Sequence, residues 1–338
     1  MSDVEIGLGL QSNLSLPEYA RLAAAAEAHG VDVLSVFADL LFQPPLPALL
    51  EMARVTERVR LGAACWNPYT MHPYEIAGQL AALDSASGGR AYLGLARGTW
   101  LGDIGVTQPR PLAHLREAVE FVYRLLAGEG AGFQGEVFRL EPGVAPRYET
   151  HRPDPPLLIG AWGPRTVAMA GTVAREVKIG GTANPAMIPV MRERLEPGER
   201  GAGREPGAVR IVVGAVTVVD LDGAAARRRA RKEVAMYLGV VGEFDPTIEV
   251  PPELLADIKA RVALGDHDGA GALIPDELLD LFAFSGTPEQ VAAQAQRLIE
   301  AGVGRVEFGT PQGLDTLQGI ELIGSKVLPA LDRSPVGR

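Results

Sequence analysis

Eight short apolar runs recur along the chain, and most are followed by a stretch in which apolar residues repeat at helical spacing. The runs cover residues 4–10, 31–37, 60–66, 91–96, 156–161, 176–181, 210–219 and 305–310. Continuous apolar strands separated by helices are typical of a parallel sheet covered on both faces. Eight repeats favour closure into a (β/α)8 TIM barrel over a doubly wound sheet. Such a barrel predicts that the functional residues lie at the carboxyl ends of the strands.

The first helix is the best marked. Ser15 and Glu18 form a capping-box pattern, and Gly30 supplies a stop. The other predicted helices cover residues 47–58, 73–87, 113–127, 224–238 and 315–331, with one more beginning at Pro164.

The 338 residues fit one barrel domain over 1–338, with insertions at about 128–155 and 240–286. The first insertion is rich in glycine and proline and contains a hairpin-like segment at 135–142, and the second contains a further helical pattern. Loops of this length serve as lids or interface elements, or they are solvated insertions. Both interpretations stay open at this point.

The net charge of −10 argues against a nucleic-acid groove. The basic run at 226–232 is accordingly read as a solvated helix face. One cysteine excludes an intrachain disulfide framework and fits a reducing cytoplasm. The first residues lack a signal-peptide pattern, and no apolar run approaches the roughly 20 residues of a membrane span. We therefore expect a cytoplasmic protein that acts on a small molecule, without a membrane or nucleic-acid partner.

Common catalytic motifs are absent from the sequence. It has no CxxC, HExxH, GxSxG or Walker A pattern, and no GxGxxG follows the first strand. The five histidines are scattered, so we expect no metal site. A barrel without an evident nucleophile often leaves the difficult chemistry to a bound cofactor.

The segment GPRT at 163–166 is the clearest positive signal. Pro164 suits the first helical position, and the amides of Arg165 and Thr166 then lie at the positive end of a helix. Gly163 lets a ligand approach the backbone. The pattern indicates an anion site after the fifth strand, although an ordinary helix start would use the same residues.

Other strand ends also carry candidate residues. Asp39 can accept a hydrogen bond from a cofactor hydroxyl or act as a cap. Trp66 and Trp100 can line the site of an aromatic cofactor or pack at the end of the barrel. Cys65 suits a small buried hydrophobe, and His72 suits a cap for the helix that Pro73 begins.

With these residues assembled, the chain resembles the luciferase-like monooxygenase superfamily. The nearest likeness is to its coenzyme F420 (deazaflavin)-dependent branch, typified by methylenetetrahydromethanopterin reductase. The resemblance rests on four segments and covers nearly the whole chain. They are LDSASGGRAYLGLARG (83–98), ARVTERVRLGAACWNPYTMHP (53–73), IGAWGPRT (159–166) and SGTPEQVAAQAQRLIEAGVGRVEFGT (285–310).

The resemblance implies a TIM barrel with a deazaflavin, or alternatively FMN, at the carboxyl end. It also implies a non-prolyl cis peptide at the end of the third strand, at Ala64–Cys65 or, next, Ala63–Ala64. The implied cofactor-binding residues are Asp39, Ala64, Cys65, Gly98, Thr99, Trp162, Gly163, Pro164, Arg165, Thr166, Gly180 and Gly181. The implied catalytic positions are Gln11, Asp39 and Arg97, and the substrate side is expected to include Phe37, Trp66 and Trp100. A homo-oligomer, dimer or tetramer, is a family expectation.

Several positions depart from the family pattern. Leu40 follows Asp39 where alcohol and sugar-phosphate dehydrogenases carry histidine, which argues against alcohol oxidation. Thr99 replaces an acidic residue of the reductase, which puts the pterin substrate in doubt, and Gln11 stands where relatives often carry an acid. Arg97 either polarises the acceptor or pairs with Asp103.

We therefore expect a reductase that uses F420 to reduce a C=C or C=N bond of a small molecule. An FMN-dependent monooxygenase and a non-catalytic flavin-binding barrel are the alternatives.

Overall fold

Parallel strands form the centre of the computed structural model, which describes residues 3–128 and 130–334. Eight of the described strands form the barrel: β1 (Glu5–Leu10), β2 (Val33–Val36), β3 (Arg60–Ala63), β4 (Leu93–Ala96), β7 (Leu157–Gly160), β8 (Glu176–Gly180), β9 (Arg210–Val219) and β11 (Arg305–Gly313). The hydrogen-bonded order is β3-β2-β1-β11-β9-β8-β7-β4, and isolated bridges at Leu61–Ala91 and Trp66–Leu95 join β3 to β4. The expected TIM barrel is confirmed. Of the expected span 1–338, residues 1–2, 129 and 335–338 lie outside the described residues.

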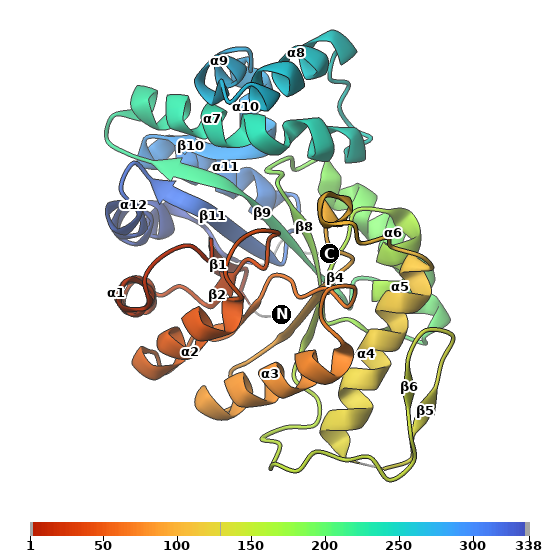
Figure 1. Cartoon of the computed structure of the whole chain (residues 1–338). Coiled ribbons are helices and arrows are strands. Elements are labelled where there is room, and N and C mark those ends of the chain that lie inside the picture. Colours follow the sequence, from red (N-terminus) through yellow and green to blue (C-terminus); the bar gives the residue numbers. More distant parts are fainter. Residues whose placement is uncertain (1–2, 129, 335–338) are drawn as a thin grey trace.

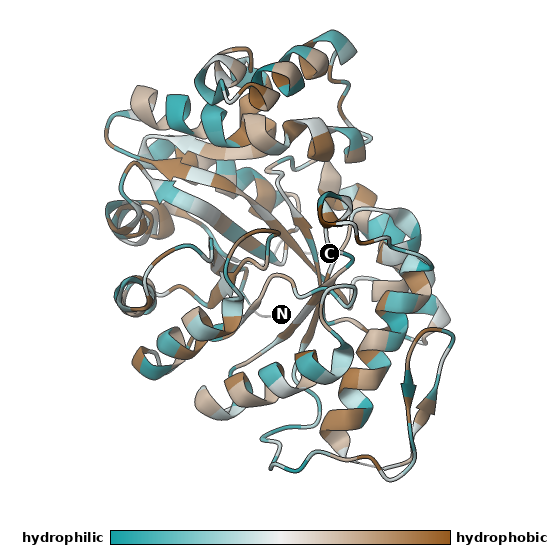
Figure 2. Cartoon of the chain, viewed as in Figure 1, coloured by the Kyte–Doolittle hydropathy of each residue, from teal (hydrophilic) through white to brown (hydrophobic). Residues whose placement is uncertain are grey.

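Helices surround the strands, as Figure 1 shows. They are α1 (Leu16–Ala28), α2 (Pro45–Val55), α3 (Pro73–Ala86), α4 (Pro111–Ala127), α5 (Pro164–Val173), α6 (Met187–Gly201), α7 (Gly223–Val241), α11 (Pro288–Glu300) and α12 (Thr316–Leu322). Ser15 and Glu18 form the expected capping box. The helix expected over 315–331 changes type, because α12 is followed by a π-helical turn at Ile323–Val327 and a 3-10 turn at Leu328–Ala330. Hydrophobic residues concentrate in the central strands and on the helix sides that face them (Figure 2).

Charged side chains occupy the barrel interior. Five of the barrel strands begin with a charged residue, namely Glu5, Arg60, Glu176, Arg210 and Arg305. Together with Glu307 and Lys178, each two residues further along its strand, these side chains form a connected set of ion pairs that we call the axial ion-pair series. The series occupies space that branched apolar residues fill in many TIM barrels.

Glycines on the inner face of the barrel make room for these long side chains. A Cβ at Gly214 would lie 3.3 Å from Lys178 Cε and 3.4 Å from Glu307 Cβ. A Cβ at Gly62 would lie 2.5 Å from the ring of Tyr92. The interior therefore combines a few long polar residues with a small apolar cluster of Val33, Tyr92, Leu158 and Val212.

The second insertion folds into a layer over α7, at the top of Figure 1. It consists of η2 (Gly242–Phe244), α8 (Pro252–Ala263), α9 (His267–Ala272), α10 (Asp276–Phe282) and β10 (Ala283–Gly286). The sequence analysis missed β10, a short strand that follows α10 directly and pairs with the end of β9.

The sequence suggested that the basic run on α7 is a solvated face, and this is true of only part of it. Arg228 and Arg229 are exposed, whereas Arg227 and Arg231 are turned toward α10. Arg227 contacts Asp276 and Asp280, and Arg231 contacts Asp276. The side chain of Arg227 is only 15% exposed, because α10 covers it. These ion pairs attach the second insertion to the barrel.

The first insertion carries the expected hairpin, formed by β5 (Phe133–Gln134) and β6 (Arg139–Leu140) and lying beside α4 (Figure 1). Its turn is bound by Glu117 of α4. The carboxylate of Glu117 accepts hydrogen bonds from the amides of Glu136, Val137 and Phe138 at 2.9, 2.8 and 3.1 Å. Burial tends to raise the pKa of Glu117, but the three N–H donors outweigh it and lower the pKa.

Replacing Glu117 with glutamine should lower the free energy of unfolding by about 1–3 kcal/mol, because the amide turns an NH2 group toward backbone donors. Urea unfolding measures the loss, and faster tryptic cleavage at Arg139 would localise it to the hairpin. Glu120→Gln on the same helix is the matched control, since Glu120 is 41% exposed and its one ion pair within the described part of the chain is with Arg124. Equal unfolding midpoints for both variants would contradict this role of Glu117.

Among the described residues, no helix combines the length and the apolar character needed to cross a membrane.

Candidate functional site

The carboxyl face of the barrel, meaning the residues that follow the carboxyl ends of its strands, brings Gln11 and Asp39 together. Gln11 Nε2 donates to Asp39 Oδ2 at 3.1 Å. Gln11 Oε1 is buried and has no hydrogen-bond partner among the described residues. The residue Asp39 as a whole is exposed. Protein atoms around its carboxyl still remove part of the hydration of the charged form and raise its pKa, against the hydrogen bond from Gln11 and the charge of Lys178, which lower it.

The peptide bond Ala64–Cys65, at the end of β3, is cis, which confirms the first of the two expected positions. The Thr310–Pro311 bond, within β11, is also cis. Burial raises the pKa of the Cys65 thiol to about 12, so the thiolate is scarce at neutral pH. His72 caps α3, with Nδ1 accepting from the amide of Tyr74 at 3.1 Å. Cys65 and His72 therefore act separately, as a partly buried thiol and a helix cap.

The turn after β4 presents Gly98, Thr99 and Trp100. Gly98 has φ +82°, and Trp100 has φ +59° with 45% of its surface exposed. Arg97 donates from Nε to Gln108 Oε1 at 3.0 Å, and the described salt bridges include none between Arg97 and Asp103. The ion pair considered from the sequence is thus replaced by a hydrogen bond, and Arg97 remains exposed.

Helix α5 begins at Pro164 with Gly163 as its N-cap, as the sequence predicts. A Cβ on Gly163 would meet no atom within 4 Å, so the backbone there is open. The first-turn amides of Arg165 and Thr166 belong to the donors that a helix leaves without intrahelical partners. Beside them, the ring of Trp162 lies 6.2 Å from that of Phe244, which comes from the second insertion.

Besides Trp100, two aromatic residues are predicted on the substrate side, Phe37 and Trp66, and they differ in environment. Phe37 is half-buried, and Lys178 Nζ lies 4.9 Å from its ring centroid. Trp66 is only 1% exposed and packs in the hydrophobic core, which fits the packing role weighed for it.

The sequence analysis missed a polar cluster directly below this face. Glu307 contacts Lys178 and accepts a hydrogen bond from Ser35 Oγ at 2.8 Å, and Ser35 also hydrogen-bonds Tyr92 at 2.8 Å. Burial tends to raise the pKa of Glu307, but Lys178 and Arg305 outweigh it and lower the pKa. Alternation in EVKIG and RVEFG, in which every second residue is charged or glycine, was the available signal.

Three features of the carboxyl face fit a flat cofactor with a phosphate group. The backbone at Gly163 is open, and a Cβ on Gly180 would have a single neighbour within 4 Å among the described residues, Lys178 Cε at 3.9 Å. Gln11 Oε1 has no hydrogen-bond donor among the described residues, so a ligand can supply one. Gly181 has φ +83°, and a Cβ there would lie 3.1 Å from Val241. No group of three or more metal-ligating side chains occurs within residues 3–128 and 130–334.

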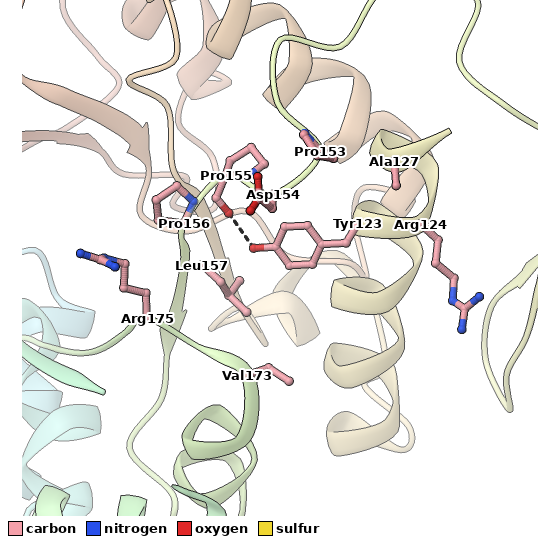
Figure 3. A pocket seen from close by; sticks show the side chains of 10 residues that line it. All are labelled: Tyr123, Arg124, Ala127, Pro153, Asp154, Pro155, Pro156, Leu157, Val173 and Arg175. Carbon is pink, nitrogen blue, oxygen red and sulfur yellow. Dashed lines mark hydrogen bonds between the residues drawn. The ribbon is translucent and has the colours of Figure 1, made fainter. Parts of the chain in front are cut away.

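A pocket of about 540 Å³ lies at the opposite end of the barrel (Figure 3). Its lining includes Leu157 at the start of β7, Arg175 just before β8, and Tyr123. The Tyr123 hydroxyl donates a hydrogen bond to Pro155 O at 2.7 Å. The amino ends of TIM-barrel strands serve stability and not catalysis, so we place the functional site at the carboxyl face.

Comparison with known proteins identifies the family. Residues 3–305 match the model of the luciferase-like monooxygenase family. The chain is 33% identical, over 83% of its length and 85% of the relative's, to 5,10-methylenetetrahydromethanopterin reductase of Archaeoglobus fulgidus. It is 28% identical to F420-dependent glucose-6-phosphate dehydrogenase of Nakamurella multipartita, covering 95% and 94% of the two chains.

The solved structure of coenzyme F420-dependent tetrahydromethanopterin reductase from Methanopyrus kandleri superposes with a TM-score of 0.86. The match covers 98% of this chain and 100% of that one, at 25% identity. The fold, the family model and the full-length relatives agree, and the chain belongs to the luciferase-like monooxygenase family of enzymes.

Proposed function

We propose that the protein is an F420-dependent reductase that transfers hydride to a C=C or C=N bond of a small molecule. The observation that carries the proposal is the full-length similarity, in sequence and fold, to enzymes whose names specify F420. When bound, the reduced deazaflavin supplies a hydride, which is chemistry that protein side chains lack.

The residues of the carboxyl face would hold this cofactor. The open backbone at Gly163 and the amides of Arg165 and Thr166 suit its phosphate. The Ala64–Cys65 peptide, Gly98 and Thr99 would support the ring, beside Asp39.

The chain's own residues would position the acceptor and limit water. Gln11 and Asp39 hold each other in place, and Phe37 provides an apolar wall. Leu40 stands beside Asp39 where a histidine would be needed to take a proton from an alcohol, so reduction is favoured over alcohol oxidation. A homo-oligomer and a cytoplasmic location remain expectations.

The test is to incubate the purified protein separately with oxidised F420 and with FMN, and then to supply reduced F420 with a panel of electrophilic alkenes and imines. We expect F420 to bind, and at least one acceptor to reoxidise it. Tight FMN binding with NAD(P)H-linked oxygen consumption would overturn the proposal in favour of a monooxygenase. Binding without turnover of any acceptor would favour a non-catalytic barrel.

A further inference from the structure

Lys178 is a buried cation directly below the carboxyl face. It lies on the inner side of β8, two residues before Gly180, which ends the strand. Its ammonium contacts Glu307 and lies over the ring of Phe37, and its side chain is 8% exposed. Its charge also affects the pKa values of Cys65 and Asp39, so it reaches the two groups expected beside the cofactor and acceptor.

Three glycines lie around the Lys178 side chain. Lys178 pairs across the sheet with Gly160 of β7, and a Cβ at Gly214 of β9 would lie 3.3 Å from its Cε. A side chain at Gly180 would have Lys178 Cε as its nearest neighbour, at 3.9 Å. On these sides Lys178 is bordered by backbone and not by side chains, and the Phe37 ring borders it on another.

The ammonium of Lys178 is held in place below the carboxyl face. It pairs with Glu307, which also accepts a hydrogen bond from Ser35, and Ser35 in turn hydrogen-bonds Tyr92. Within the axial ion-pair series, Lys178 is the member that lies over the ring of Phe37 and whose charge lowers the pKa of Asp39. The cation is therefore fixed in position beside two residues expected at the cofactor and the substrate.

We propose that Lys178 is a substrate-binding residue and that it selects α,β-unsaturated carbonyl acceptors. The inference rests on the proposed hydride transfer and narrows its substrate class. When hydride adds to the β-carbon, the C=C π bond breaks and its electron pair moves into conjugation, which places negative charge on the carbonyl oxygen. The ammonium of Lys178 stabilises that oxygen, and a proton from solvent completes the C–H bond at the α-carbon. Two electrons pass from the reduced cofactor to the acceptor.

The same charge disfavours the other acceptor class. An iminium acceptor is cationic before hydride transfer and neutral afterwards, so a nearby ammonium opposes its binding. Removing a single charge-stabilising donor from an oxyanion site lowers kcat by about 10²–10³-fold. We expect a loss of this size only for carbonyl acceptors.

A binding experiment tests the charge without the cofactor. The probe is 4-nitrophenol, whose ionised form absorbs visible light. Binding to the full-length protein should raise the ionised fraction of the probe about tenfold or more at fixed pH, as an opposite charge nearby favours the ionised form. Lys178→Met with Glu307→Gln removes both charges of the pair while Arg305 keeps Glu176 as its partner, and it should abolish the increase, whereas Lys178→Arg should keep it.

The matched control is Lys259→Met with Glu243→Gln, which removes an exposed lysine–glutamate pair at the surface. It should behave as the wild type. An unchanged ionised fraction in the wild-type protein, or the same increase in the Lys178→Met/Glu307→Gln variant, would overturn the inference.

A turnover experiment separates this inference from the proposed function. With reduced F420, kcat for 2-cyclohexen-1-one should fall about 10²–10³-fold in the Lys178→Met/Glu307→Gln variant. F420 affinity and the rate with an iminium acceptor should not fall. If F420 binds and enone turnover is indifferent to Lys178, the inference fails alone. If F420 does not bind to the wild type, the proposed function fails, and this inference fails with it.

Discussion

Replacing Glu176 with glutamine is expected to lower the free energy of unfolding at pH 7 by about 3–5 kcal/mol, the usual cost of removing one partner from a buried ion pair. Glu176 is 1% exposed and contacts Arg60 at 3.0 Å and Arg305 at 3.2 Å. Arg305 is fully buried, and its three side-chain nitrogens have no hydrogen-bond partner among the described residues. The variant would leave Arg305 dependent on Glu307, 3.8 Å away.

Urea unfolding followed by tryptophan fluorescence measures this loss. Glu141→Gln is the control, because the ion pair of Glu141 with Arg139 is more than half exposed on both sides and such pairs contribute little. A similar small effect for both variants would show that the axial ion-pair series is not a stabilising element.

The same variant makes a prediction about pH. Burial tends to raise the pKa of Glu176, but Arg305 and Arg60 outweigh it and lower the pKa below that of an unfolded glutamate, which is about 4.3. The unfolded state therefore takes up the proton first as the pH falls, and stability from Glu176 is present above that pH and lost through the folded pKa. Wild-type stability should decline more steeply than that of Glu176→Gln below about pH 5. Parallel curves would contradict the assignment.

The eight barrel strands could be predicted because their outward residues form short apolar runs between helical patterns. The inward residues were harder to interpret. Glu176 and Arg305 each begin a run and look like exposed strand ends, whereas they are buried against each other. In most barrels the inner positions are apolar, so a polar interior was not expected. The alternation of charge and glycine with aliphatic residues was the signal that the sequence offered.

Helix α6 and strand β10 show a second limit of sequence interpretation. Pro197 and Gly198 lie inside α6, and both residue types disfavour helix interiors. Tertiary packing overrides that preference here. The position of the Ala64–Cys65 cis bond came from the family resemblance, because local sequence carries no signal for a non-prolyl cis peptide. The predicted contacts of the cofactor and substrate residues stay predictions.

The packing of α6 against α5 leads to the other large expected effect. Gly198→Ala should lower the free energy of unfolding by about 3 kcal/mol, at the upper end for an overpacked site. A Cβ at Gly198 would lie 1.8 Å from the backbone oxygen of Ala168 on α5, and one at Gly171 would lie 2.5 Å from Leu195 O on α6. Since backbone atoms are the obstacle, no rotamer change relieves the contact, and the two helices must separate.

Separation of these helices would also disturb the proposed phosphate site, because Ala168 follows the first turn of α5 directly. We expect F420 affinity to fall about tenfold, since small misplacements of binding groups have large effects. Gly201→Ala, in the last turn of α6, is the matched control, because a Cβ there meets no atom within 4 Å. It should leave affinity unchanged and stability equal or slightly higher. Thermal unfolding and F420 titration measure both quantities, and a Gly198→Ala variant as stable as Gly201→Ala would show that α5 and α6 do not need the close contact.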